Sequence, residues 1–240
     1  MIEVFNRYEH KYMLDKETYQ KVTDVLGTHM ELDKYNVGGR PYVIANIYFD
    51  TKDDYFIRRS LEKPIYKEKL RLRAYGVPDE NDKVFLELKK KCNGIVNKRR
   101  TVLQLGEAYS FAKTGKMPPQ KSYMNAQVLK ELAYFLNCYE LKPKVYLAYD
   151  RMAYFENGNP DLRISFDTNI RTRRAALKLE SGDFGEPLLH TEYYLMEIKT
   201  SLSKPLWLAD MLSELNIRRT SFSKYGMEFK KYINQTKAAI

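Results

Sequence analysis

Charged side chains recur at every second position in several segments, a spacing that could bring many of them to one place. The clearest case is KEKLRLR at 67–73, where every second residue is Lys or Arg. The same alternation of charged residues is present at 7–11, 87–91, 98–100, 163–167 and 197–199. Because successive side chains of a β-strand point to opposite faces, this spacing predicts strands with one charged face and one largely apolar face.

A face crowded with Lys and Arg has the chemistry of a phosphate site. Like charges that lie within a few ångströms repel each other, so such a face calls for water and a polyanion. Arg binds phosphate through its planar fork, and Lys adds a compact charge. Carboxylates among these cations would repel phosphate, so they indicate a bridging divalent cation. Glu197 and Glu87 are the first candidate metal ligands, followed by Glu9 and Asp167; an internal ladder of ion pairs is the alternative.

The elements that must position these faces are strands interrupted by a few helices. Period-two segments predict eight strands, at roughly 4–12, 41–50, 65–75, 83–91, 95–103, 142–155, 161–169 and 190–199. Helical spacing of apolar residues predicts helices at 15–26, 121–136, 205–215 and 223–235, with a loop at 174–189. No repeat and no long linker divides the chain, so residues 1–240 are predicted to form a single domain.

Eight antiparallel strands of this length can close into a barrel, and two arrangements of their faces are conceivable. The charges could face water, or they could line a tunnel while the apolar faces lie outside, beneath the helices. Helices with apolar stripes need a surface to cover, which favours the second arrangement. The predicted fold class is therefore α+β: an eight-stranded antiparallel β-barrel tunnel with a charged lumen, covered by helices.

The composition narrows the partners. The 240 residues contain 41 Lys and Arg against 31 Asp and Glu, a net charge of +10, and 44% are hydrophobic. Nucleic acid is not the expected partner, because much of the basic charge lies on strands and the aromatics do not interleave with it as stacking platforms. No apolar run reaches the ~18 residues of a membrane helix. The start lacks the apolar core of a secretion signal, so the expected location is cytoplasmic.

Nine segments, in order along nearly the whole chain, carry a family resemblance. They are RYEHKY at 7–12, IYFDT at 47–51, KLRLR at 69–73, FLELKK at 85–90, VNKRR at 96–100, PKVYLAYDR at 143–151, RISFD at 163–167, LMEIK at 195–199 and SFSKY at 221–225. With them the chain resembles the VTC-type polyphosphate polymerase domain, within the triphosphate tunnel metalloenzyme superfamily that includes the CYTH enzymes. The CYTH pattern Glu-x-Glu-x-Lys is here Arg7-x-Glu9-x-Lys11, which puts two-metal hydrolysis in doubt and favours the VTC branch.

The resemblance implies a tunnel that binds the triphosphate of ATP and a growing polyphosphate chain, with a divalent cation, Mn²⁺ or Mg²⁺, as cofactor. The residues expected to act on the transferred phosphoryl group are Arg71, Arg73, Lys89, Arg151 and Arg163. Further phosphate contacts are expected from Lys11, Lys69, Lys98, Arg100, Tyr149, Lys199, Ser223 and Lys224. Glu197 is the metal ligand that the resemblance favours.

The predicted function is metal-dependent phosphoryl transfer from ATP to a growing inorganic polyphosphate chain. Such an acceptor is already anionic near neutral pH, so no general base is required. Two alternatives stay open: a tripolyphosphatase or nucleoside triphosphatase, and a polyphosphate-binding module without turnover. Synthesis and hydrolysis share almost all their parts. The expected partners are ATP and inorganic polyphosphate; the chain has no predicted membrane segment of its own, and a membrane-protein partner and the oligomeric state are left open.

Overall fold

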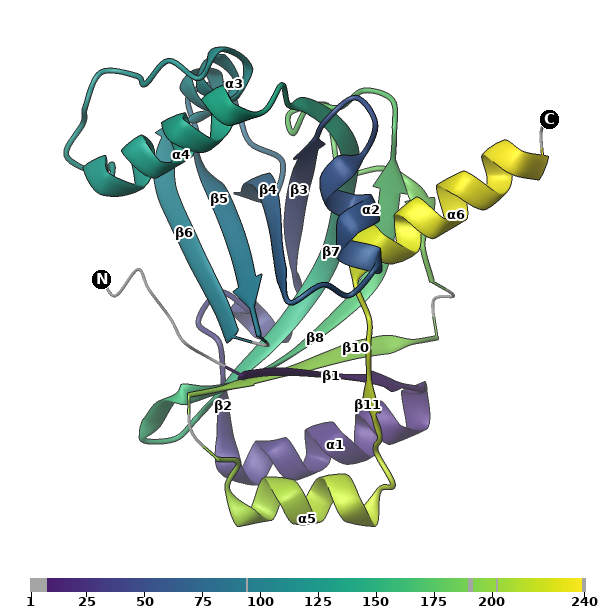
Figure 1. Ribbon diagram of the computed structural model, residues 1–240. Coiled ribbons are helices and arrows are strands. Elements are labelled where there is room, and N and C mark those ends of the chain that lie inside the picture. The colour runs from purple at the N-terminus through teal and green to yellow at the C-terminus, as the bar shows by residue number, and fades with distance from the viewer. Residues whose placement is uncertain (1–7, 94, 190–191, 202, 239–240) are drawn as a thin grey trace.

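A single antiparallel sheet contains all the strands that the structure describes (Figure 1). The structure is a computed structural model that describes residues 8–93, 95–189, 192–201 and 203–238. Eight strands of seven residues or more match the eight expected ones: β1 (Tyr8–Leu14), β3 (Tyr42–Asp50), β4 (Tyr66–Tyr75), β5 (Lys83–Cys92), β6 (Ile95–Gln104), β7 (Lys142–Glu156), β8 (Asn159–Arg173) and β10 (Tyr194–Thr200). Three short strands extend the sheet: β2 (Met30–Leu32), β9 (Glu186–Pro187) and β11 (Arg219–Thr220).

The sheet folds over on itself, and its two edges are not hydrogen-bonded to each other in the described part of the chain. The strand order is β11-β1-β10-β8-β7-β3-β4-β5-β6, with β2 beside β7 and β9 beside β8. Figure 1 shows β3 to β6 above, β1 and β10 below, and the long strands β7 and β8 passing from one half to the other. The expected α+β tunnel of antiparallel strands is confirmed, but the sheet is curved and open where a closed barrel was expected. Side chains join the halves instead, as in the 3.3 Å ion pair between Lys89 on β5 and Glu9 on β1.

The apolar strand faces lie on the outside of the curve, beneath helices. In the upper half, Leu70 and Leu86 belong to a core that includes Phe111 of α3 (Leu105–Thr114) and Leu132 of α4 (Ala126–Cys138). In the lower half, a second core joins the outer faces of β1, β8 and β10 to α1 (Lys16–His29) and α5 (Leu206–Glu214). This placement confirms the second of the two expected arrangements, in which the charges face inward.

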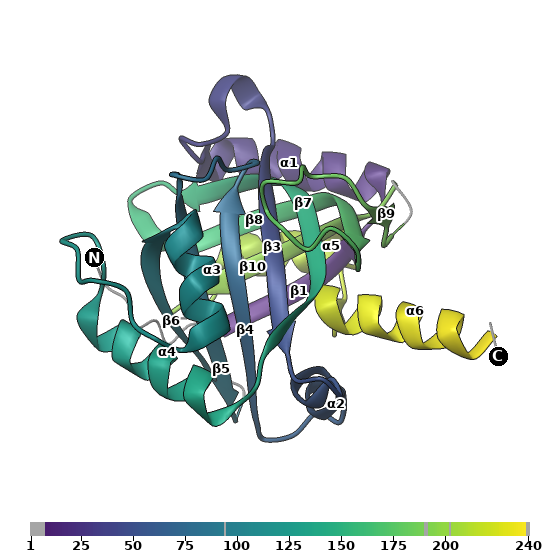
Figure 2. The ribbon, with the colours of Figure 1, turned by 90° about the horizontal axis from the view of Figure 1, so that it is seen from above.

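Two further helices flank one end of the tunnel and contribute residues to the wall of the cavity there (Figure 2). α2 (Tyr55–Leu61) follows β3, and α6 (Lys224–Ala238) packs against it through a core that includes Ile57 and Phe229. Ser223 precedes α6 and accepts a hydrogen bond from the Gly226 amide at 3.2 Å, so Lys224 stands at the first turn. The end of the tunnel thus receives the first residues of α6.

The expected helices at 15–26, 121–136, 205–215 and 223–235 correspond to α1, α4, α5 and α6, whereas α2 and α3 were not expected. Asp15 accepts a hydrogen bond from the Thr18 amide at 2.8 Å, as its position before α1 predicts. The structure adds the two-residue strand β9 within the expected loop at 174–189. No helix in the described residues is both long enough and apolar enough to cross a membrane.

Candidate functional site

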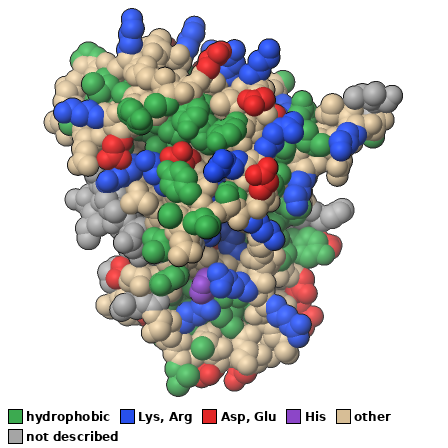
Figure 3. Space-filling view, in the orientation of Figure 1, with side chains coloured by type: hydrophobic (Ala, Val, Ile, Leu, Met, Phe, Trp, Pro, Cys, Tyr) green, Lys and Arg blue, Asp and Glu red, His purple; other side chains and the backbone are tan. Residues whose placement is uncertain are grey.

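The inward strand faces enclose a basic cavity. An inner cavity of about 120 Å³ is lined by eight Lys or Arg residues against two carboxylates, Glu9 and Glu197. It shares Lys69 and Lys89 with an outer cavity of about 680 Å³. Among the described residues, the walls of this outer cavity carry eight Lys or Arg residues and one carboxylate, Glu9. Figure 3 shows Lys and Arg side chains gathered around a hollow between the upper and lower halves of the molecule. This excess of cations suits a polyanionic ligand.

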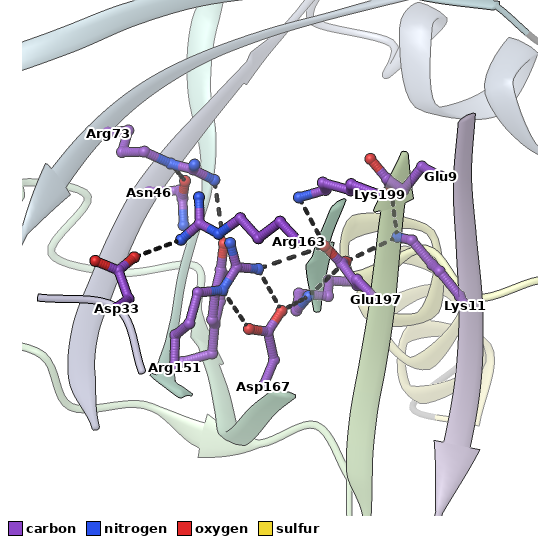
Figure 4. Close-up of polar contacts among 12 residues, drawn as sticks. Glu9, Lys11, Asp33, Asn46, Arg73, Arg151, Arg163, Asp167, Glu197 and Lys199 are labelled. Atoms are coloured by element: carbon purple, nitrogen blue, oxygen red, sulfur yellow. Dashed lines mark hydrogen bonds and ion pairs between the residues drawn. The ribbon is translucent and has the colours of Figure 1, made fainter. Parts of the chain in front are cut away.

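Glu197 lines the inner cavity and lies among several cations (Figure 4). Its carboxylate is 3.2 Å from the ammonium of Lys11 and 3.2 Å from that of Lys199. The same carboxylate lies 3.4 Å from Arg151 and 3.4 Å from Lys224. Burial alone would raise the pKa of Glu197, but Lys11 and Lys224 outweigh it and hold that pKa well below its usual value. Glu197 is therefore an anion shared among four cations.

Asp167 lies behind Arg151 and does not line either cavity. Its side chain is fully buried and accepts two hydrogen bonds from the Arg151 guanidinium, at 2.6 and 2.8 Å. Lys224 also contacts this carboxylate, which places the start of α6 against β8. A bidentate pair fixes the plane of the guanidinium, so Asp167 orients Arg151 toward the cavity.

Glu87 on β5 holds a second group of cations, which lie on β4 and β6. Its buried carboxylate is 2.7 Å from Arg71, 3.5 Å from Lys98 and 3.9 Å from Arg73. Burial would raise the pKa of Glu87, but these cations, Arg71 above all, hold it well below its usual value. Like Asp167, Glu87 stands behind its arginines and not in the cavity wall.

Polar side chains of β3 and β7 complete the support of these arginines. Asn46 accepts from Arg73 at 2.9 Å, and the Tyr149 hydroxyl accepts from the same guanidinium at 3.1 Å. The Tyr48 hydroxyl accepts from Arg71 at 3.2 Å. Asn46 and Tyr48 were not among the expected site residues. A polar Asn in the otherwise apolar run at 41–49 is the signal that could have identified Asn46.

Three of the lysines in the tunnel have pKa values of about 7 or 8. Burial and the neighbouring ammonium groups of Lys89 and Lys11 lower the pKa of Lys69 to about 7. Lys69 donates a 3.1 Å hydrogen bond to Ser223 and has no carboxylate partner in the described part of the chain. Burial also lowers the pKa of Lys98 and that of Lys199 to about 8, although Glu87 and Glu197 respectively oppose the change. The carboxylates of the tunnel therefore do not balance its cations, and a bound anion would raise the pKa of these lysines and favour their protonated form.

Arg163 contacts a different carboxylate, whereas Arg100 is paired with Glu87 in the register of β5 and β6. Arg163 is 3.1 Å from Asp33 and donates a 3.0 Å hydrogen bond to the Tyr42 hydroxyl. The Arg100 guanidinium lies 4.9 Å from the centre of the Phe85 ring. Of the expected site residues, the inner cavity brings together Glu9, Lys11, Lys69, Arg71, Arg73, Lys89, Tyr149, Arg151, Glu197, Lys199, Ser223 and Lys224. Arg7 lies outside the described residues.

The four candidate metal ligands fall into two pairs. Among the described residues, no three Asp, Glu, His or Cys side chains are grouped so that they could hold a metal ion between them. Glu9 and Glu197 face the cavity and share Lys11, at 3.3 and 3.2 Å, while Glu87 and Asp167 are engaged by arginines. Magnesium-like cations commonly take one or two carboxylates and complete their shell with substrate phosphates. The donor set of Glu9 and Glu197 fits such a shared ion.

The curved antiparallel sheet with a charged interior defines a fold of the triphosphate tunnel class. A putative adenylate cyclase from Bacillus halodurans aligns over 92% of this chain and 96% of its own, with a TM-score of 0.54 and 15% identity. A putative adenylyl cyclase from Hippeastrum, described as having a dominant triphosphatase activity, aligns over 92% and 93%, with a TM-score of 0.54 and 18% identity. These likenesses show the fold.

The VTC domain model matches residues 6–233, and the chain belongs to the VTC domain family. Vacuolar transporter chaperone complex subunit 4 of Trypanosoma brucei brucei is 24% identical over a region that covers 93% of this chain. The subunit of the same name from Schizosaccharomyces pombe is 31% identical over 76% of the chain. The matched regions cover 34% and 30% of these two relatives, so the chain spans about a third of their length.

Proposed function

We propose that the chain transfers the γ-phosphoryl group of ATP to a growing inorganic polyphosphate chain inside the tunnel. The observation that supports this most is the inner cavity, in which eight Lys or Arg side chains face two carboxylates. A linear polyanion matches this excess, and the adjoining 680 Å³ cavity extends the basic surface for a longer chain. Membership of the VTC domain family supports polyphosphate as the polyanion, through the resemblance drawn from the sequence.

The proposed roles follow from how firmly each cation is held. Arg71, Arg73 and Arg151 are fixed by Glu87, Asn46 and Asp167, so their donors are oriented before the substrate arrives. Preorganised donors stabilise charge that develops on a transferring phosphoryl group. Lys89 and Arg163 are proposed to assist them. Phosphate binding is proposed for Lys11, Lys69, Lys98, Arg100, Tyr149, Lys199, Ser223 and Lys224.

Glu197, with Glu9, is proposed to hold one divalent cation, Mn²⁺ or Mg²⁺. Such a cation neutralises phosphate charge and orients the terminal phosphoryl group for in-line attack. Glu197 is proposed as the main ligand, because it lines the inner cavity on β10, the strand between β1 and β8. Glu87 and Asp167, the other two candidate metal ligands, are proposed to act through the arginines that they orient.

Several wider statements belong to the same proposal. Residues 1–240 are proposed to form one domain, because the eight strands and their helices use most of the chain. The proposed location is the cytoplasm. The relatives are named as subunits of a complex, which supports a partner protein for this chain, including one in a membrane. Hydrolysis of tripolyphosphate or a nucleoside triphosphate is the second candidate function, since water could attack in the same cavity.

Incubation of the pure protein with ATP and Mn²⁺, followed by gel separation of phosphate chains, tests the proposal. We expect long chains, no chains once a chelator removes the metal, and a large loss of product in Lys89→Ala. Lys130→Ala is the matched control, because Lys130 is exposed on α4, outside the tunnel. Release of free phosphate without chain growth would favour hydrolysis. Tight, salt-dependent polyphosphate binding without any product would favour a binding module.

A further inference from the structure

Aromatic side chains gather at the end of the tunnel where β3 begins and β4 ends. The ring centres of Tyr42 and Tyr75 are 6.0 Å apart, and those of Tyr75 and Phe85 are 5.7 Å apart. Tyr35, in the segment before β3, lies 6.4 Å from Tyr42. Tyr75 is 51% exposed and Tyr35 is 65% exposed, so both offer ring surface to a ligand. These four residues are called the aromatic rim.

The aromatic rim is continuous with the phosphate-binding face of the lumen. Phe85 pairs directly with Arg73 across β4 and β5, and directly paired residues place their side chains on the same face. Tyr75 is the next inward-facing residue after Arg73, and Arg73 lines the inner cavity. Tyr75 stands four residues from Arg71, about 13 Å along an extended strand. That span is comparable with the reach from the base to the outer phosphates of an extended nucleoside triphosphate.

Guanidinium groups lie between the rim and the lumen. Arg100 covers the Phe85 ring at 4.9 Å, and Arg163 donates to the Tyr42 hydroxyl at 3.0 Å. The Arg163 Nε atom is buried and has no hydrogen-bond partner among the described residues. The Arg163 side chain as a whole is 25% exposed, so its guanidinium could reach a phosphate or ribose oxygen next to a stacked base.

The opposite mouth has a different chemistry. The outer cavity is lined by lysines, among them Lys63, Lys67 and Lys91, and Phe222 is the single aromatic in its described wall. Figure 2 shows that α2 and α6 lie at one end of the upper strands, whereas the segment leading into β3 lies at the other. One mouth therefore suits a chain of phosphates, and the other suits a flat aromatic ligand with phosphates attached.

We propose that the aromatic rim binds the base of the nucleoside triphosphate by stacking. Every nucleobase has a π-face, and stacking on an aromatic side chain adds affinity with little sequence preference. The triphosphate then passes Arg73 into the inner cavity and points toward the lysine-lined mouth. The rim distinguishes a nucleotide donor from inorganic tripolyphosphate, which has no base. This inference rests on the proposed use of a nucleoside triphosphate in the tunnel.

The test compares two ligands in two matched variants. Calorimetric titration measures the affinity of wild type, Tyr75→Ala and Tyr66→Ala for a non-hydrolysable ATP analogue and for inorganic tripolyphosphate. Tyr66 is the control because it is an exposed tyrosine, 41% accessible, at the other end of the same strand. We expect Tyr75→Ala to weaken the ATP analogue roughly 5- to 100-fold, the range for loss of one stacking partner. Its tripolyphosphate affinity should stay at the wild-type value.

Further outcomes separate this inference from the proposed function. Tyr75→Trp should bind the ATP analogue about as tightly as wild type does, because tryptophan also offers a stacking surface. Equal losses for both ligands in Tyr75→Ala, or no loss for either, would overturn the aromatic rim while leaving the phosphate tunnel in place. A wild-type protein that binds neither ligand would contradict the proposed function, and the rim inference would fail with it.

Discussion

Replacement of Glu87 by Gln separates a residue that positions arginines from a residue that binds metal. Glu87 is fully buried, 2.7 Å from Arg71 and 3.5 Å from Lys98. Glutamine keeps the shape of the side chain but removes its negative charge. Two or three cations would then share a buried position without a compensating anion, and a buried charge without its partner is strongly destabilising.

The expected magnitude follows from the burial of this group. Removal of one partner of a buried ion pair costs about 3–5 kcal/mol. In a domain of this size 1 kcal/mol corresponds to roughly 2–4 °C in Tm. Thermal unfolding followed by circular dichroism should therefore show a Tm about 6 to 20 °C lower in Glu87→Gln. Because the folded-state pKa of Glu87 lies below its usual value, its contribution is present at neutral pH and is lost as the solution is acidified.

Two further measurements make the prediction specific. Tripolyphosphate should raise the Tm of Glu87→Gln more than that of wild type, because the ligand supplies the missing negative charge. The Mn²⁺ concentration that gives half-maximal activity should stay unchanged in Glu87→Gln and rise in Glu197→Gln. Of these two residues, Glu197 lines the cavity and Glu87 does not. A Glu87→Gln protein that has the same Tm as wild type but requires far more Mn²⁺ for activity would refute this reasoning and indicate that Glu87 is a metal ligand.

Two further predictions test the same site, and a third tests how α2 is held against the sheet. Arg71→Ala and Arg73→Ala should each lose binding of short polyphosphate while keeping the native circular dichroism spectrum; unchanged binding would contradict their inward orientation. Tripolyphosphate affinity should fall as the pH rises from 6.5 to 9, because Lys69 and Lys199, with pKa values of about 7 and 8, lose their protons; calorimetry in two buffers should show proton uptake on binding, and a flat pH profile would count against it. Asp50→Ala should lower the stability by about 2–4 kcal/mol in urea unfolding, since its buried carboxylate accepts from two α2 amides at 2.9 Å each and burying donors without partners is costly; stability within 1 kcal/mol of wild type would oppose this.

Much of the tunnel could be predicted from the sequence because its walls obey one simple rule. In KEKLRLR at 67–73 the period of two assigns each side chain to a face, and burial of Leu70 and Leu72 confirms that assignment. The sequence also predicted which face of the sheet lies outside, since helices with an apolar stripe such as α4 need an apolar surface to cover. Local spacing and the need to bury apolar surface were therefore sufficient for the layers of this fold.

Contacts between distant elements could not be predicted in the same way. Whether β6 pairs with β1 depends on the curvature of the whole sheet, which no local pattern contains. α2 has only seven residues, too few to show a helical period, and Asp50, a strand residue, holds the first amides of that helix. Asp33, which pairs with Arg163, comes from a turn without any motif.

The structure also divides the basic residues into two kinds, and this division bears on how the tunnel could act. Arg71 and Arg151 are each held by a buried carboxylate through more than one donor, so their orientation is set in the free protein. Lys69 and Lys199 are half-buried and have lowered pKa values, so their charge depends on what the tunnel contains. Fixed arginines suit the point where charge develops during transfer, because they need no reorganisation there. Lysines that regain protons as phosphate arrives suit the path of a chain that must also move on.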